Sequence, residues 1–500
     1  MTTENSRLKK RFLSGIMLLL ALAGCSPGPR NQVPAGVWPE IYPDYTGVEI
    51  PVNIAPLNFR MKEPSSGVVV TFSSGGEKLV VKGKERIDIP LKRWHRLVAK
   101  AAGDSLMVGV TALYDGVWKE YKLFPLYVSD QPVDPWLAYR LIAPGYVVWS
   151  KMGIYQRNLT NFDQDPVITN SLIPGSCVNC HSFRQNDPGQ MMFHLRAPNG
   201  GTLLTRNGIT EKLATKTEKT VSNFVYPYWH PGGGHIAFSV NKISQMFHAV
   251  REKRIEVMDS ESDLVVYDIE RNEVLTSDLI SGPQFFETFP AFTPDGRSLV
   301  FCRAEAKKMP AQFDSVRYNL CAIGFDAATG AFGNRVDTLV HASAMNKSIS
   351  FPRVSPDGKF LMYTLSDYGN FSIWHNEADL YLLDLETLES RRLDEVNSDR
   401  TESYHSWSSG GGWFVFSSRR DDGLYTRPYF ARLDGTGKVS KPFMLPQKDP
   451  DFYLNLPESF NIPEFVSGRV SANPDKIEKL LYKGAPKQVE VSNELGTGHY

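Results

Sequence analysis

The residues whose types and spacing most clearly indicate a chemical function lie in IPGSCVNCHSFRQ, residues 173–185. This stretch contains Cys177, Cys180 and His181. Two thiols separated by two residues can form thioether bonds to the two vinyl groups of one porphyrin, and the adjacent histidine can bind its iron. With five cysteines and ten histidines in 500 residues, this pattern would arise by chance in roughly one of a thousand such chains. The spacing predicts one covalently attached haem c, with Cys177 and Cys180 as covalent attachment sites and His181 as the proximal iron ligand.

Other interpretations of the two cysteines fit less well. A thioredoxin-like redox pair requires a βαβ context, whereas Pro174 and Gly175 precede this pair without any parallel-sheet pattern. A structural zinc site requires four ligands, and Cys302 and Cys321 lie more than a hundred residues away. A structural disulfide between Cys177 and Cys180 remains open as the alternative.

A haem iron has a second axial position, and three residues after the motif are candidates for it. Met191, Met192 and His194 lie 10 to 13 residues after His181. A methionine ligand would raise the reduction potential relative to a histidine ligand. The competing interpretation of MMFHL is a buried strand in which methionine fills the core.

The N-terminus indicates the compartment. Basic residues between Arg7 and Arg11 precede an apolar run, FLSGIMLLLALAG, that is short for a membrane span and typical of a secretory signal. The run ends in LAGC, which resembles a bacterial lipobox with Cys25 as the acylated residue. We therefore expect a signal peptide over 1–24, a tether over 25–45 and a lipid anchor in a membrane.

Composition favours short strands and excludes one class of partner. The chain is 42% hydrophobic and 12% aromatic, with 39 glycines and 33 prolines, which favours an all-β protein with frequent turns. Without residues 1–24, the chain has 51 basic and 54 acidic residues. No basic stripe is present, so we expect no nucleic-acid partner.

Four stretches repeat one pattern of an aromatic residue, a large apolar residue three positions later, a turn and an alternating strand. They are YPYWHPGGGHIAF (226–238), FPAFTPDGRSLVF (289–301), FPRVSPDGKFLMY (351–363) and YHSWSSGGGWFVF (404–416). Strand pairs at such intervals bury their faces by stacking radially. We expect a β-propeller of about six blades over 191–465, with one blade built partly from the segment after residue 440.

The remaining segments are predicted as separate units. Alternating segments over 46–130 suggest a small immunoglobulin-like β-sandwich. Residues 131–190 are expected to form a linker that carries the haem motif, wedged between the sandwich and the propeller. Residues 466–500 form a polar tail with a short helix.

The F-P-x-x-S-P-D-G pattern at 351–358 resembles the TolB-type propeller repeat. With the lipobox and GSCVNCHSF, the chain is similar to lipoproteins of Bacteroides-type bacteria that carry a haem-attachment motif. This resemblance implies a Gram-negative envelope and little about a substrate. Because no acidic residue directly follows Cys25, we expect an outer-membrane anchor facing the periplasm, and we expect an unknown protein or glycan partner at the propeller.

The function expected from these features is electron transfer or redox-linked partner binding. An enzyme is disfavoured, because the chain lacks the G-x-S-x-G elbow and hydrolase domain of the propeller-bearing peptidases. The alternative is a non-enzymatic TolB-like envelope scaffold in which Cys177 and Cys180 form a structural disulfide.

Overall fold

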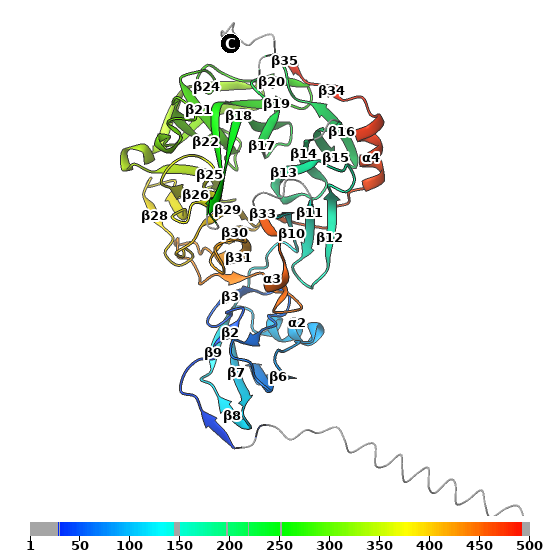
Figure 1. The fold of residues 1–500 in the computed structure, drawn as a ribbon, viewed down its shortest axis with the longest axis vertical. Helices are drawn as coiled ribbons and strands as arrows, with labels where there is room; N and C mark the ends of the chain where they lie inside the picture. The colour runs from blue at the N-terminus through cyan, green and yellow to red at the C-terminus, as the bar shows by residue number, and fades with distance from the viewer. Residues whose placement is uncertain are drawn as a thin grey trace, which may run out of the picture.

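The chain forms a ring of β-sheets with a smaller domain attached at one side (Figure 1). The computed structural model describes residues 29, 31–144, 151–196, 199–218, 220–250 and 253–492. The predicted signal peptide and Cys25 lie outside the described residues. Within the described ranges, no helix is long and apolar enough to cross a membrane.

Six sheets of the ring each contain four antiparallel strands, and we number them as blades 1 to 6. Blade 1 contains β13 (Cys177–Phe183), β14 (Gln190–Arg196), β15 (Gly201–Arg206) and β16 (Ile209–Ala214). Blade 2 contains β17 (Phe224–Trp229), β18 (His235–Val250), β19 (Lys253–Asp268) and β20 (Glu273–Leu275). Blade 3 contains β21 (Phe285–Phe292), β22 (Ser298–Glu305), β23 (Asn319–Asp326) and β24 (Ala331–Val340).

The other three blades complete the ring. Blade 4 contains β25 (Ser348–Val354), β26 (Phe360–Ser366), β27 (Asp379–Asp384) and β28 (Ser390–Arg392). Blade 5 contains β29 (Glu402–Trp407), β30 (Trp413–Ser418), β31 (Arg427–Arg432) and β32 (Phe443–Met444). Blade 6 contains β33 (Ser459–Val466), β10 (Trp136–Ile142), β11 (Met152–Asn158) and β12 (Gln164–Thr169).

The first strand of each blade lies at the centre of the ring. These strands contact one another in the order β13, β17, β21, β25, β29 and β33, and β33 returns to β13. Radial stacking buries the faces that a single sheet would leave exposed. The predicted all-β propeller of six blades is therefore confirmed.

Blade 6 closes the ring by joining two distant parts of the chain. β33 pairs with β10, which precedes blade 1 in sequence, so the expected contribution from the segment after residue 440 is correct. The expectation of a linker over 131–190 differs from the structure, because β10 to β12 belong to blade 6 and β13 opens blade 1. Those strands lack a repeat of the aromatic turn pattern and are therefore hard to recognise in the sequence.

The N-terminal domain is built on one sheet rather than on the predicted two-sheet sandwich. Its strands are β1 (Gln32–Pro34), β3 (Glu49–Pro51), β5 (Gly67–Ser74), β6 (Glu77–Gly83), β7 (Ser105–Tyr114), β8 (Val117–Glu120) and β9 (Phe124–Ser129), beside a separate pair of β2 (Ile41–Tyr42) and β4 (Arg60–Met61). Helix α2 (Leu91–Lys100) contacts β5 and β6. Trp94, Leu97 and Val98 are its buried residues, a helical spacing in a segment that was expected to be a strand.

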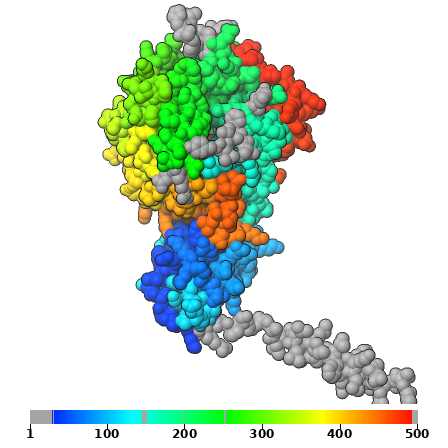
Figure 2. Space-filling view, in the orientation of Figure 1, coloured from blue at the N-terminus to red at the C-terminus, as the bar shows by residue number. Residues whose placement is uncertain are grey.

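The N-terminal domain is attached to blades 5 and 6 by charged and apolar contacts. Asp134 accepts hydrogen bonds from the hydroxyls of Ser408 (2.9 Å) and Ser409 (2.6 Å). Arg60 forms an ion pair with Asp451, which lies in the short helix region between blades 5 and 6. One apolar cluster contains residues of both units. Figure 2 shows the blue N-terminal domain pressed against the orange surface of the ring.

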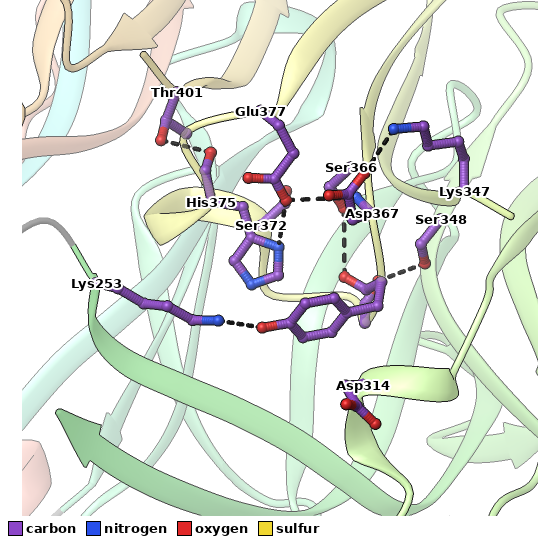
Figure 3. Close-up of polar contacts among 12 residues, drawn as sticks. Lys253, Asp314, Lys347, Ser348, Ser366, Asp367, Ser372, His375, Glu377 and Thr401 are labelled. Atoms are coloured by element: carbon purple, nitrogen blue, oxygen red, sulfur yellow. Dashed lines mark hydrogen bonds and ion pairs between the residues drawn. The ribbon is translucent and has the colours of Figure 1, made fainter.

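One hairpin of the ring is much longer than the others. β18 and β19 have 16 residues each and run across the ring from blade 2 towards blade 4 (Figure 1). Glu256 on β19 lies 3.1 Å from the Nε2 atom of His375 in blade 4. Figure 3 shows Glu377 beside the His375 ring and Lys253 entering from the hairpin. The hairpin is thus fastened to blade 4 by a buried charged cluster.

The C-terminal tail lies on the outer edge of blades 1 and 2. Helix α4 (Pro474–Lys483) buries Ile477 and Leu481. β34 (Lys487–Gln488) extends blade 1 beside β16, and β35 (Glu490–Val491) extends blade 2 beside β20. The short helix expected in the tail is present.

Candidate functional site

Every innermost strand contains a two-residue β-bulge whose first residue has a positive φ angle. The six bulge pairs are Cys180-His181, Tyr226-Pro227, Phe289-Pro290, Phe351-Pro352, Tyr404-His405 and Ile462-Pro463. Their first residues have φ values of 54°, 50°, 53°, 55°, 42° and 51°. A bulge redirects side chains at a functional position of a sheet. The ring of bulges therefore defines the wall of the central channel.

The haem motif lies in the bulge of blade 1. CHSF at 180–183 occupies the same place as FPAF at 289–292, FPRV at 351–354 and YHSW at 404–407. This alignment is present in the sequence but is hard to recognise, because Cys180 stands where blades 2 to 5 have an aromatic residue. The second half of the motif is thus also a propeller repeat, whereas Cys177 has no counterpart among the repeats.

A pocket of about 460 Å³ lies in the channel next to this bulge, and we call it the channel pocket. The first residues of all six bulges line it, so it lies on the axis of the ring. Tyr228, Trp229 and Trp407 add to the aromatic wall, and Arg353 and Glu464 are the charged residue types in it. Its volume falls within the range of small-molecule and cofactor pockets, about 300 to 1,000 Å³.

His181 is buried in the wall of the channel pocket, and its ring makes no hydrogen bond of good geometry. The residue is 3% exposed, and the one backbone group that acts on its ring as a hydrogen-bond partner is that of Ile462. Burial, aided by the nearby charge of Arg140, lowers the pKa of His181 to about 3, although the backbone of Ile462 opposes the shift. The imidazole is therefore neutral at physiological pH, which is the form that binds metals.

His405 in blade 5 shows how the same position is satisfied when no other group is needed. Its Nε2 atom donates to the carbonyl oxygen of Met362 at 2.9 Å, and burial lowers its pKa to about 3. A buried polar group without a partner costs roughly 1 to 3 kcal/mol. His405 Nδ1 also lacks a partner among the described residues, so His181 differs from His405 only in lacking a well-formed hydrogen bond at one ring nitrogen, which leaves that nitrogen available to an additional group.

Cys177 precedes the bulge and lies among further buried polar atoms without partners. Both motif cysteines are buried free thiols. Burial raises the pKa of the Cys177 thiol, while the charges of Arg140 and Arg196 act in the opposite direction. Ser176 Oγ, Asn179 Oδ1 and Arg140 Nε have no partner in the described part of the chain. Unpaired buried atoms are rare in native proteins, so their concentration here indicates a group that they would face.

The three candidate distal ligands, Met191, Met192 and His194, do not lie at the channel pocket. Met191 belongs to an apolar cluster shared with blade 6, and Met192 belongs to one shared with blade 2. His194 Nδ1 lies 3.1 Å from the Thr202 hydroxyl. None of them is among the residues that line the channel pocket. The competing interpretation of MMFHL as a core strand matches β14.

The motif also does not lie at the interface between the two units, as the sequence had suggested. The lining of the channel pocket comes from the propeller alone, because β13 is the innermost strand of a blade and not part of a linker. Cys302 and Cys321 are buried free thiols in blade 3. Across the described residues, no three histidine, cysteine, aspartate or glutamate side chains are grouped as a metal site.

Comparisons with known proteins give distant likenesses in fold. No protein-family model and no curated protein matches the sequence. TolB from Acinetobacter baumannii is similar with a TM-score of 0.42 and 13% identity, over 73% of this chain and 79% of that chain. The periplasmic gluconolactonase of Pseudomonas aeruginosa has a TM-score of 0.32 and 12% identity, over 62% and 96%. A DUF4784 family protein from Bacteroides caccae has a TM-score of 0.31 and 8% identity, over 71% and 95%.

These likenesses lie too far from the chain to assign a function. The propeller fold rests on the strand order of this chain and on the closed contact of its six innermost strands.

Proposed function

We propose that this protein is an envelope lipoprotein that carries one covalent haem c in its propeller channel and uses it for electron transfer or redox-linked partner binding. Cys177 and Cys180 are the covalent attachment sites, and His181 is the proximal iron ligand. The observation that carries this proposal is the neutral, buried imidazole of His181, which makes no hydrogen bond of good geometry and lines the same cavity as Cys180.

The residue types present fit such a group: Cys180 and His181 line the channel pocket, whereas Cys177, on the same strand β13, is not among the lining residues. Each free thiol would add across one vinyl group, forming a carbon–sulfur bond while the thiol hydrogen passes to the neighbouring vinyl carbon, so the step needs no oxidant. The channel pocket offers many aromatic side chains in its wall. The haem would supply one-electron chemistry at its iron.

The protein contributes binding, orientation and electrostatics around this group. His181 is held neutral by burial and is therefore ready to donate a lone pair. Arg140 and Arg196 place positive charge beside Cys177. Neither arginine forms an ion pair with a described carboxylate.

The proposed compartment follows from the N-terminal segment. Acylation of Cys25 would tether the protein to a membrane, and we place it at the outer membrane facing the periplasm. Attachment of haem c outside the cytoplasm agrees with export. The propeller would bind a protein or glycan partner, and no nucleic acid is expected.

A second candidate function is a non-enzymatic envelope scaffold in which Cys177 and Cys180 pair as a structural disulfide. One observation favours it. Tyr404-His405 occupies the same bulge position as Cys180-His181 without any cysteine, so a histidine at this position does not require haem.

The absorbance of the full-length protein as purified separates the two candidates. We expect a Soret band near about 410 nm that remains with the protein after acid-acetone extraction, because thioether bonds resist this treatment. Non-covalent haem would leave with the solvent. A colourless protein from cells that mature c-type cytochromes would contradict the proposal and support the scaffold.

A further inference from the structure

The channel pocket contains a half-buried cation that makes few contacts with the protein. Arg353 on β25 lines this pocket, and its Nη1 atom donates to the carbonyl oxygen of Pro352 at 2.8 Å. A guanidinium has five N–H donors, and the other four have no acceptor among the described residues. The guanidinium lies 5.0 Å from the ring centre of Tyr228, which holds it by a cation–π contact.

The nearest acidic group does not neutralise this charge. Glu464 on β33 lines the same pocket, but it accepts a hydrogen bond from the backbone N–H of Phe183 at 3.0 Å. The two side chains are not within ion-pair distance of each other. Burial raises the pKa of Glu464 to about 8, although Arg353 and the Phe183 N–H oppose this shift. At neutral pH the pocket therefore holds one net positive charge.

The tryptophans in the wall around Arg353 already have hydrogen-bond partners, and the wall contains many aromatic rings. The indole N–H of Trp407 donates to the carbonyl of Arg353 (3.2 Å), and that of Trp229 donates to the carbonyl of Ser182 (3.3 Å). Phe289 and Phe351 complete an aromatic surface. Such a wall can pack against an aromatic ring of a ligand. A guanidinium can bind a carboxylate by donating two parallel hydrogen bonds.

We propose that the channel pocket binds a ligand with a flat apolar body and a carboxylate, and that the Arg353 guanidinium holds this carboxylate. The inference needs only the pocket and does not depend on the thioether bonds. A carboxylate in this position has two possible sources: a free small molecule, or a side-chain carboxylate of a porphyrin attached at Cys180.

The pH dependence of binding follows from Glu464. Below pH 8 its carboxyl is neutral, and above pH 8 it is ionised and repels the ligand carboxylate. Affinity should therefore fall as pH rises through about 8. The other titratable or charged residues that line the pocket are Cys180, His181, Tyr226, Tyr228, Arg353, Tyr404 and His405. Both histidines have pKa values of about 3 and stay neutral over this range.

The test uses 2-naphthoate and its neutral analogue 2-naphthamide, measured by titration calorimetry on two full-length proteins. One is the protein as purified, and the other carries Cys177→Ser and Cys180→Ser, which leaves the pocket without a covalent group. We expect naphthoate to bind at least about ten times more tightly than the amide, as charge-assisted hydrogen bonds of roughly 1.5 to 3 kcal/mol predict. Arg353→Met should remove this preference, whereas Arg353→Lys should retain part of it.

Each outcome decides the inference. Binding of naphthoate to the purified protein supports the inference, with a free small molecule as the source of the carboxylate, whether or not a group is attached to the thiols. Binding to the serine variant alone supports it with the attached porphyrin as the source. Glu464→Gln keeps the acceptor for Phe183 and should remove the loss of affinity above pH 8, which tests the site without changing Arg353. Equal affinity for the acid and the amide in both proteins, or affinity unaffected by Arg353→Met, would overturn the inference.

Discussion

Replacing both Cys177 and Cys180 by serine is expected to abolish covalent haem, from about one haem per chain to none that resists extraction. Serine preserves the size and burial of both side chains but cannot form a thioether. The bulge of blade 1 should remain, because the other five blades form it without cysteine. The measurement is the Soret absorbance that stays with the protein after acid-acetone extraction.

The matched control replaces the other two buried thiols, Cys302 and Cys321, by alanine. Both lie in blade 3 and neither lines the channel pocket, so this variant should keep its covalent haem in full. An equal loss of colour in both variants would mean that thiol removal acts through folding, and unchanged colour in the serine variant would contradict the attachment.

The second large effect is expected at the tether of the long hairpin. Replacing His375 by leucine should destabilise the contact between β19 and blade 4 by about 1.5 to 3 kcal/mol, because the buried Glu256 carboxylate loses its charge-assisted hydrogen bond to His375 and keeps only Lys253 and Tyr368 as partners. His375 is enclosed by Glu256 at 3.1 Å and Glu377 at 3.4 Å. Amide hydrogen exchange in residues 253–262 measures the local opening, and exchange there should become much faster. Unchanged protection in that segment would refute the tether.

The pH dependence of this effect has a definite sign. Burial alone would lower the pKa of His375, but hydrogen bonds and charges from Glu256 and Glu377 outweigh it and raise the pKa to about 9. A histidine with a raised pKa stabilises the folded state fully below its unfolded pKa of 6.5 and loses this contribution as pH rises through 9. The difference in amide protection of residues 253–262 between the wild type and the leucine variant should therefore be largest at pH 6 and smallest above pH 9. His341→Leu, at an exposed histidine, should show no such difference.

The fold was predictable where the repeat is regular. The turn and strand pattern around Phe289 and Phe351 recurs in four blades, so the sequence predicts the propeller. Blade 6 was only partly predictable, because β10 pairs with β33 more than three hundred residues later, and such pairing leaves no local pattern. The helix around Trp94 was missed because its segment is short and rich in strand-forming neighbours.

The site was predictable from covalent chemistry but not from packing. Cys177, Cys180 and His181 stand out by spacing alone, and the structure brings Cys180 and His181 to one pocket. Arg353 and Glu464 carry no motif, and their importance arises from burial in the channel. The distal ligands proposed from proximity in sequence fail to reach the pocket, because β14 directs Met191 and Met192 between blades.

The most direct test of the account is the mass of one tryptic peptide. Cleavage after Arg157 and Arg184 releases residues 158–184, which contain Cys177 and Cys180 and no other cysteine. The account predicts that this peptide from the purified protein is heavier by roughly 616 Da, the mass of one haem. The same peptide at its unmodified mass, or lighter by two hydrogens as a disulfide, would contradict it.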